Sequence, residues 1–133
     1  MDLKKLSDQY RDELLNNVLP FWLQNSQDKE FGGYFTCLDR EGKVFDTDKF
    51  IWLQGREVWM FSMLYNKVEK RQEWLDCAVQ GGEFLKKYGH DGNYNWYFSL
   101  DRSGRPLVEP YNIFSYTFAT MAFGQLSLAT GNQ

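Results

Sequence analysis

An arginine lies in the middle of an apolar stretch of the chain. Residues 49–66 are mostly aromatic and aliphatic, and Arg56 is a cation among them. A helix that is apolar on every side is typical of a buried helix, and a buried charge is costly unless it has a partner. A guanidinium can bind the oxygens of a ligand or stabilise a developing negative charge. The alternative is an internal salt bridge from Arg56 to Asp46, Asp48 or Glu57, and the residues leave both interpretations open.

Aromatic side chains near Arg56 are candidates for the wall of a ligand site. Trp52 lies four residues before Arg56 and therefore shares its helix face. It either stacks against a ligand or belongs to the core. Phe114 stands 62 residues after Trp52 at the start of a second apolar stretch, and Tyr111 lies just before it. Phenylalanine donates no hydrogen bond, so we expect Phe114 to form a pocket wall, whereas a loop aromatic such as Tyr111 either contacts substrate or supports the fold.

Other chemistry-bearing residues exclude several classes of function. His90 is the single histidine of the chain, so a mechanism with two histidines cannot be complete within it. The two cysteines lack metal-ligand spacing, and we expect no metal site. Glu57 and Glu109 would serve a glycoside hydrolase only if the fold held them at a defined separation. A glycoside hydrolase and a non-enzymatic helical interaction module therefore remain alternatives.

The elements that position these residues follow from apolar periodicity and turn residues. Steps of three and four residues predict helices, and Asp-x-x-Gly turns between short aromatic runs predict β-hairpins. Pro20 should kink or end the first helix. The expected elements are helices over 2–23, 49–66, 71–88 and 112–130, with hairpins over 31–45 and 95–106.

The two halves of the chain resemble each other. Residues 39–42 align with residues 101–104 at an offset of 62, and at that offset Phe61 meets Phe123. The repeated unit, within 1–70 and 71–133, is an amphipathic helix, a hairpin and a nearly all-apolar helix. This alternation suits a mainly α double ring, an α/α toroid with outer and inner helices. Because two units make only part of such a ring, we expect the chain to be the front segment of a longer domain.

Composition and charge bear on the binding partners and on the cellular compartment that we expect for the chain. The 133 residues carry a net charge of −3 without a basic stripe, which disfavours nucleic acid. No apolar run is long enough for a membrane span, and the start of the chain has no signal-peptide pattern. A cytoplasmic protein without membrane contact is the simplest expectation.

Three stretches carry a family resemblance that extends over the whole chain in order. Residues 32–56, from Gly-Gly-Tyr-Phe to Trp-Leu-Gln-Gly-Arg, closely resemble the N-terminal region of N-acylglucosamine 2-epimerases. Residues 95–102 and 110–115 are similar to that family as well. The resemblance implies a partial (α/α)6 barrel, about one third of the length of a family member.

The resemblance also implies a function. The family interconverts N-acyl-D-glucosamine and N-acyl-D-mannosamine by moving the proton on C2, with histidines that lie in later parts of its sequences. It implies a functional arginine at Arg56, an amino sugar as substrate, and no acid/base role for His90. It implies no cofactor, and it leaves open a nucleotide effector and a homodimer. On this basis the isolated chain should be inactive.

Overall fold

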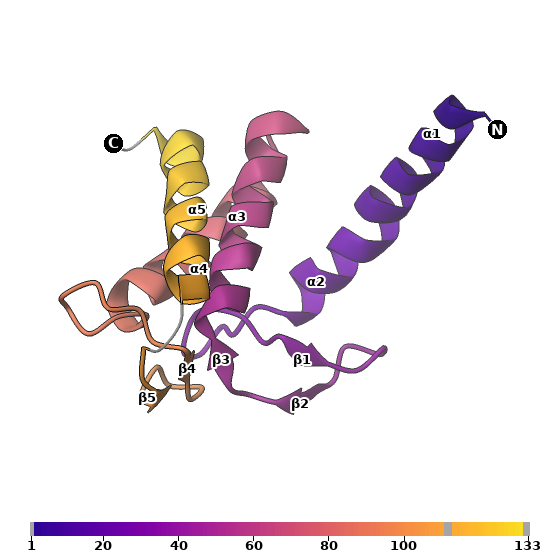
Figure 1. Ribbon diagram of the computed structural model, residues 1–133. Helices are drawn as coiled ribbons and strands as arrows, with labels where there is room; N and C mark the ends of the chain where they lie inside the picture. Colours follow the sequence, from indigo (N-terminus) through magenta and orange to yellow (C-terminus); the bar gives the residue numbers. More distant parts are fainter. Residues whose placement is uncertain (1, 111–112, 132–133) are drawn as a thin grey trace.

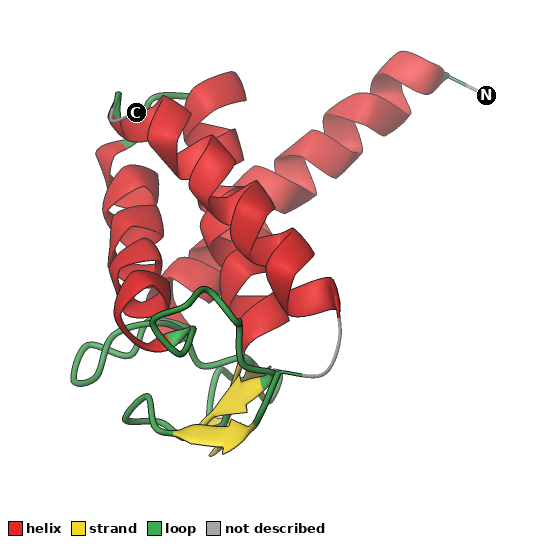
Figure 2. Cartoon of the chain, turned by 60° about the vertical axis from the view of Figure 1, so that its left-hand side comes forward, coloured by secondary structure: helices red, strands yellow, loops and turns green. Residues whose placement is uncertain are grey.

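Four helical segments make up most of the chain, and short strands gather at one end of them (Figures 1 and 2). The computed structural model describes residues 2–110 and 113–131. The elements are α1 (Leu3–Glu13), a π-helical segment η1 (Leu14–Val18), α2 (Leu19–Asn25), β1 (Cys37–Leu38), β2 (Val44–Asp46), β3 (Lys49–Phe50), α3 (Ile51–Lys67), α4 (Gln72–Tyr88), β4 (Ser99–Leu100), β5 (Pro106–Val108) and α5 (Ile113–Thr130). With α1, η1 and α2 taken as one continuous segment, the predictions of about four helices and two hairpins are confirmed.

The first helical segment runs from Leu3 to Asn25 through Pro20. The Asp2 side chain begins it by accepting hydrogen bonds from the backbone N–H groups of Lys4 and Lys5, at 3.1 Å each. Of the two outcomes expected at Pro20, a kink or an end, the helix does not end there. The local change is the π-helical turn before it, where the Leu19 N–H bonds to the Leu14 carbonyl. Such turns accommodate irregular positions within a helix.

The strands form two small antiparallel sheets. β1 pairs with β2, and the Gly42 N–H closes the predicted turn on the Asp39 carbonyl at 3.0 Å. β3, β4 and β5 form the second sheet in that order. The prediction that Lys49 begins a helix is wrong, because Lys49 and Phe50 pair with β4 and the helix begins at Ile51. The Ile51 N–H donates to the Phe98 carbonyl at 3.0 Å, which fixes the start of α3 to the second hairpin.

The core lies where α3 packs against α4 and α5. Buried side chains from α3 and α4 dominate it, and the loop residue Tyr34 joins them with no exposed surface. The fully buried apolar members include Leu19, Tyr34, Ile51, Val58, Phe61, Trp74, Ala78, Leu85, Leu100 and Ala122. The prediction that residues 49–66 form a largely buried helix is therefore confirmed from Ile51 onward.

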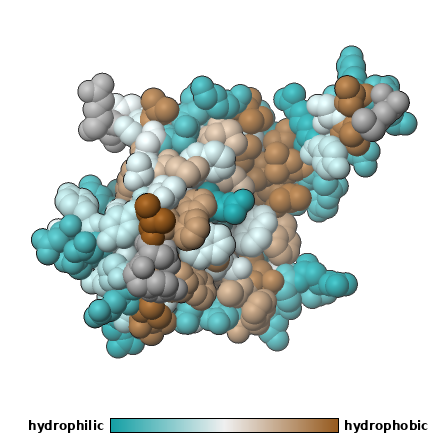
Figure 3. Space-filling model, viewed as in Figure 1, coloured by the Kyte–Doolittle hydropathy of each residue, from teal (hydrophilic) through white to brown (hydrophobic). Residues whose placement is uncertain are grey.

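The second apolar helix, α5, is much less buried than its sequence predicts. Its buried residues are the small ones Ser115, Ala119 and Ala122, which face the core. Ile113 and Leu128 are 73% and 68% exposed. Figure 3 shows this face, where apolar and intermediate side chains cover the front of the body in the region of α3 and α5. The chain therefore presents an apolar helix surface that its other described residues do not cover.

Gly81 is a close-approach position on α4. A Cβ atom there would lie 2.1 Å from the Tyr34 hydroxyl oxygen, and that hydroxyl donates to the Cys77 carbonyl at 2.7 Å. Gly82 is a second such position, because a Cβ atom there would lie 2.4 Å from the Leu126 side chain.

We predict that Gly81→Ala destabilises the chain by about 1–3 kcal/mol, because overpacking displaces Tyr34 and breaks its hydrogen bond. Gly124→Ala on α5 is the matched control, since a Cβ there meets nothing within 4 Å. It should stabilise the chain by about 1 kcal/mol through helix propensity. Urea unfolding of both variants measures the difference, and equal midpoints would contradict the packing described for Gly81.

Candidate active site

Arg56 lies on the second turn of α3 with its side chain exposed. The expectation that this cation is buried is wrong, because α4 and α5 bury other side chains of α3 and leave Arg56 at the surface. The alternative of an internal salt bridge is not found either: Arg56 makes no ion pair with Asp46, Asp48 or Glu57. The guanidinium is thus open to an anionic or hydroxyl-bearing ligand.

Trp52 lies one turn before Arg56 and packs across to α5. Its ring is 6.0 Å from that of Phe118, in a tilted arrangement. The helices approach closely here because Gly55 has no side chain: a Cβ at Gly55 would lie 2.9 Å from the Phe118 backbone. Trp52 is half-buried, so it contributes one face to the helix contact and retains some exposed surface.

Phe114 lies one turn before Phe118 on α5 and is 62% exposed. The structure therefore places Trp52, Arg56 and Phe114 on the N-terminal halves of two adjacent helices, where α3 and α5 meet. Tyr111, the remaining predicted site residue, lies outside the described residues. The roles of these four residues remain predictions.

A buried ionic cluster beneath the start of α3 was not predicted from the sequence. Lys49 and Asp28 have fully buried side chains and form an ion pair at 3.0 Å. The Lys49 ammonium also donates to the carbonyls of Gly32, at 2.6 Å, and Arg102, at 2.9 Å. Arg102 binds both carboxylate oxygens of Asp28, at 3.0 and 3.1 Å. The cluster joins the loop after α2, strand β3 and the turn of the second hairpin.

The electrostatics of the cluster depend on complete pairing. Burial alone would raise the pKa of Asp28, but hydrogen bonds from Arg102 and Lys49 outweigh it and lower the pKa to about 2. Burial lowers the pKa of Lys49, and Asp28 opposes that effect. The Lys49 ammonium also lies 4.5 Å from the centre of the Phe84 ring. Every charge in this apolar setting therefore has an opposite partner.

Glu57 is a second buried titratable group, one residue after Arg56. Its side chain accepts a hydrogen bond of 2.6 Å from the Ser26 hydroxyl, and the residue is 8% exposed. Burial raises the pKa of Glu57 to about 8, against the opposing effect of Ser26. The carboxyl is therefore mostly protonated in the folded chain at neutral pH. Glu57 is thus buried, whereas Glu109, the other carboxylate considered for a glycoside hydrolase, is exposed on a loop.

We predict that Glu57→Gln removes a pH dependence of stability. The folded-state pKa of Glu57 lies above its ordinary value of 4.5, so the folded chain binds more protons than the unfolded chain between pH 4.5 and 8. Wild-type stability should therefore fall as the pH rises through this window, by as much as about 1.4 kcal/mol per pH unit from this group. Urea unfolding at pH 5 and pH 8 measures it. Between pH 5 and pH 8 the free energy of unfolding of Glu57→Gln should fall less than that of the wild type. The free energy of unfolding of the exposed control Glu83→Gln should fall as much as that of the wild type. An equal fall for Glu57→Gln and the wild type would contradict the raised pKa of Glu57.

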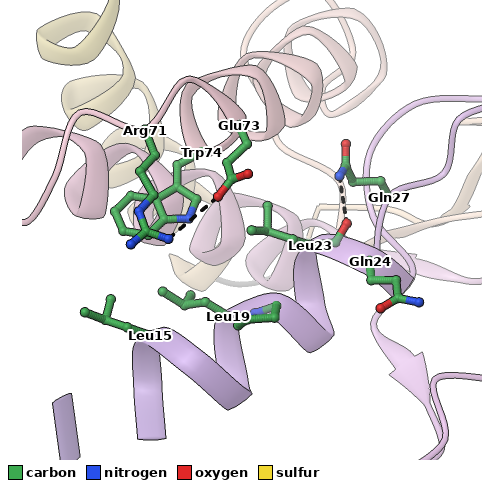
Figure 4. Close-up of a pocket in the computed structure, with 9 residues that line it drawn as sticks. Leu15, Leu19, Leu23, Gln24, Gln27, Arg71, Glu73 and Trp74 are labelled. Carbon is green, nitrogen blue, oxygen red and sulfur yellow. Dashed lines mark hydrogen bonds and ion pairs between the residues drawn. The ribbon is translucent and has the colours of Figure 1, made fainter. Parts of the chain in front are cut away.

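A groove of about 380 Å³ lies on another side of the chain, between α2 and α4. Figure 4 shows Leu15, Leu19 and Leu23 on one side of it and Trp74 with Arg71 on the other. None of the predicted site residues lines this groove. Within residues 2–110 and 113–131, no group of three or more His, Cys, Asp or Glu side chains could hold a metal ion. No helix in the described part of the chain is long and apolar enough to cross a membrane.

Comparisons with known proteins agree with the arrangement of helices and hairpins. The chain is 46% identical over 124 residues to mouse N-acylglucosamine 2-epimerase, covering 90% of this chain and 30% of that protein. The human N-acylglucosamine 2-epimerase is 46% identical over 121 residues, or 88% of this chain and 28% of its own length. The cellobiose 2-epimerase of Dictyoglomus turgidum is 29% identical over 132 residues, or 98% of this chain and 33% of that protein. The chain thus spans about a third of the length of these relatives and corresponds to their N-terminal part.

Solved structures show the same fold. The cellobiose 2-epimerase of Bacillus thermoamylovorans superposes with a TM-score of 0.87 at 29% identity, over 98% of this chain and 34% of that one. A sugar epimerase from a ruminal bacterium gives a TM-score of 0.85 at 28% identity, over 94% of this chain and 32% of that one. The chain therefore has the fold of part of an (α/α)6 barrel, as predicted. A family model described as N-acylglucosamine 2-epimerase matches residues 33–133, and the chain belongs to the N-acylglucosamine 2-epimerase family.

Proposed function

We propose that the complete protein carrying this chain is a sugar 2-epimerase that interconverts N-acyl-D-glucosamine and N-acyl-D-mannosamine. The observation that carries the proposal is the 46% identity to mammalian N-acylglucosamine 2-epimerases over about nine tenths of the chain. Identity to the cellobiose 2-epimerases is lower, at 26–30%. For this reason the proposed substrate is an N-acyl amino sugar and not a disaccharide.

In the proposed reaction the sugar ring opens, a base removes the proton from C2, and an acid returns a proton to the opposite face. Removal of the proton leaves an enolate, whose negative charge on O1 needs a fixed donor. Arg56 is exposed on α3 without an ion-pair partner, and its planar guanidinium suits two oxygens at once. We assign it the role of binding O1 and stabilising that charge.

The chain supplies part of the pocket wall and no acid/base pair. Trp52 and Phe114 lie on the same halves of α3 and α5 as Arg56 and present aromatic surface for sugar carbons. His90 lies elsewhere, in the segment between α4 and β4, with its ring stacked 5.1 Å from Tyr94. The acid and base therefore come from outside residues 1–133. The cytoplasmic setting and the homodimer remain proposals.

We predict that the complete protein converts N-acetyl-D-mannosamine into N-acetyl-D-glucosamine, whereas residues 1–133 alone give no turnover. Proton NMR of the anomeric signals of the two amino sugars measures turnover by the complete protein and by residues 1–133. Cellobiose is assayed in the same way as the alternative substrate. Turnover by residues 1–133 alone would contradict the division of roles. Cellobiose as the better substrate, or release of a monosaccharide from an oligosaccharide, would contradict the proposed activity.

A further inference from the structure

The position of Arg56 on α3 depends on the residues that flank it. Gln54, Gly55 and Glu57 are all buried, whereas the Arg56 side chain is exposed. A charge donor that is displaced even slightly from the reacting atoms loses much of its effect on the rate. The contacts of the three buried neighbours therefore decide whether the guanidinium is held where the proposed reaction needs it.

Two of these neighbours anchor α3 through groups that do not titrate. The Gln54 side chain accepts a hydrogen bond from the Tyr34 N–H and donates one to the Tyr34 carbonyl, at 2.8 Å each. Gly55 lies against α5, where a Cβ atom would come within 2.9 Å of the Phe118 backbone. An amide and a glycine keep the same contacts at every pH. They tie this part of α3 to the loop before β1 and to α5.

Glu57 is the third anchor, and it ties α3 to the end of α2. The Ser26 Oγ lies 2.6 Å from Glu57 Oε1 and 2.7 Å from the Trp22 carbonyl oxygen. A serine hydroxyl has one proton, so it cannot donate to an ionised carboxylate and to the carbonyl at the same time. A neutral carboxylic acid removes this conflict, because its own O–H donates to Oγ while Ser26 donates to Trp22. The two distances thus favour a neutral Glu57.

We propose that Glu57, as a neutral carboxylic acid bound to Ser26, is a positioning residue that holds Arg56 in place for the epimerase reaction. The proposal rests on the function proposed above. Glu57 acts through the helix and not on the sugar, since it is buried toward α2 while Arg56 is exposed. When the anchor to α2 is lost, the turn that carries Arg56 is held only from the loop before β1 and from α5.

Ionisation of Glu57 weakens this anchor. Burial raises the pKa of Glu57 to about 8, so the neutral form is lost as the pH rises through that value. The titratable groups that face it are the Tyr34 hydroxyl and, on α4, the Cys77 thiol; burial raises the pKa of both, and they stay neutral. α2 and α5 carry no charged residue within Leu19–Asn25 and Ile113–Thr130. The ionised carboxyl is therefore a buried charge without a cation, which draws the side chain toward water.

The pH profile of kcat/KM in the complete protein tests the proposal. Glu57→Gln presents a neutral donor to Ser26 at every pH, whereas the wild-type carboxyl loses its proton. Between pH 7 and pH 9 the wild-type kcat/KM should fall about 10-fold further than that of Glu57→Gln. The control Glu83→Gln, which removes an exposed carboxylate of α4, should follow the wild type. Parallel profiles for Glu57→Gln and the wild type would overturn the proposal.

Ser26→Ala is the second variant, in case Glu57→Gln fails to fold. It removes the same hydrogen bond from the side of α2 and leaves Arg56 and Glu57 in place. Its kcat/KM at pH 7 should be about 10-fold below the wild-type value, because the anchor is then missing at every pH. A wild-type kcat/KM for Ser26→Ala would contradict a positioning role.

Amide hydrogen exchange of the complete protein gives a readout that does not depend on activity. At pH 9 the amides of residues 51–58 should exchange at least about threefold faster in the wild type than in Glu57→Gln, and at pH 6 the two should match. Equal exchange at pH 9 would overturn the proposal. Absence of turnover in every variant would contradict the proposed function and the role of Glu57 with it, whereas turnover with parallel pH profiles would contradict the role of Glu57 alone.

Discussion

Lys49→Met should lower the free energy of unfolding by about 3–5 kcal/mol, the largest stability effect that we expect from a single substitution in this chain. The substitution keeps an unbranched side chain but removes the ammonium that pairs with Asp28 and bonds to two backbone carbonyls. Asp28 would then be buried with Arg102 as its one remaining cation. Two carbonyl acceptors would also lose their donor, and buried groups without partners carry their full desolvation cost.

Urea unfolding of Lys49→Met and of a surface control measures this effect. Arg105→Met removes the ion pair with Asp101, in which the arginine side chain is 83% exposed, and should cost less than about 1 kcal/mol. The double variant Asp28→Asn, Lys49→Met should recover part of the loss, because it removes the buried carboxylate that has lost one of its two cation partners. If the free energy of unfolding of Lys49→Met lay within about 1 kcal/mol of the wild-type value, the description of Lys49 as a buried and fully paired charge would be contradicted.

Arg56→Met in the complete protein should lower kcat/KM by about 10²- to 10³-fold while leaving the free energy of unfolding nearly unchanged. The loss follows from removing a charged donor to the enolate oxygen, and the unchanged stability follows from an exposed side chain that forms no ion pair with the described residues. Arg56→Lys should recover little, because a single ammonium cannot bind two oxygens in one plane.

The matched control for Arg56 is Lys67→Met, which removes an exposed cation from the last turn of the same helix. Its kcat/KM should stay within about twofold of the wild type. Equal losses for the two variants would indicate a general effect of charge on α3. Full activity of Arg56→Met would contradict the assigned role.

Local patterns predicted the helices and hairpins well. Steps of three and four residues indicated residues 71–88, and α4 runs from Gln72 to Tyr88. The Asp-x-x-Gly turns were predictable because their hydrogen bond is local: the Gly42 N–H donates to the Asp39 carbonyl three residues earlier. Lys49 and Phe50 were assigned to a helix because the strand that pairs with them lies about 50 residues later, beyond the reach of periodicity.

The candidate site was predictable in position but not in environment. The apolar neighbours of Arg56 suggested burial, yet an apolar helix can leave one face uncovered, and the exposed side of α3 carries this cation. The buried cluster had no local signature, because Asp28 lies 21 residues from Lys49 and 74 residues from Arg102. A charged residue near a turn looks the same in the sequence whether its partner is water or a distant side chain.

Deuterium exchange at C2 tests the central claim most directly. The complete protein is incubated with N-acetyl-D-mannosamine in D₂O, and the label in the N-acetyl-D-glucosamine formed is measured by NMR and mass spectrometry. The proposed deprotonation and reprotonation by two groups on opposite faces predict one deuterium at C2 of the product, with both labelling and turnover lowered by Arg56→Met. Interconversion without deuterium at C2, or no interconversion by the folded complete protein, would contradict it.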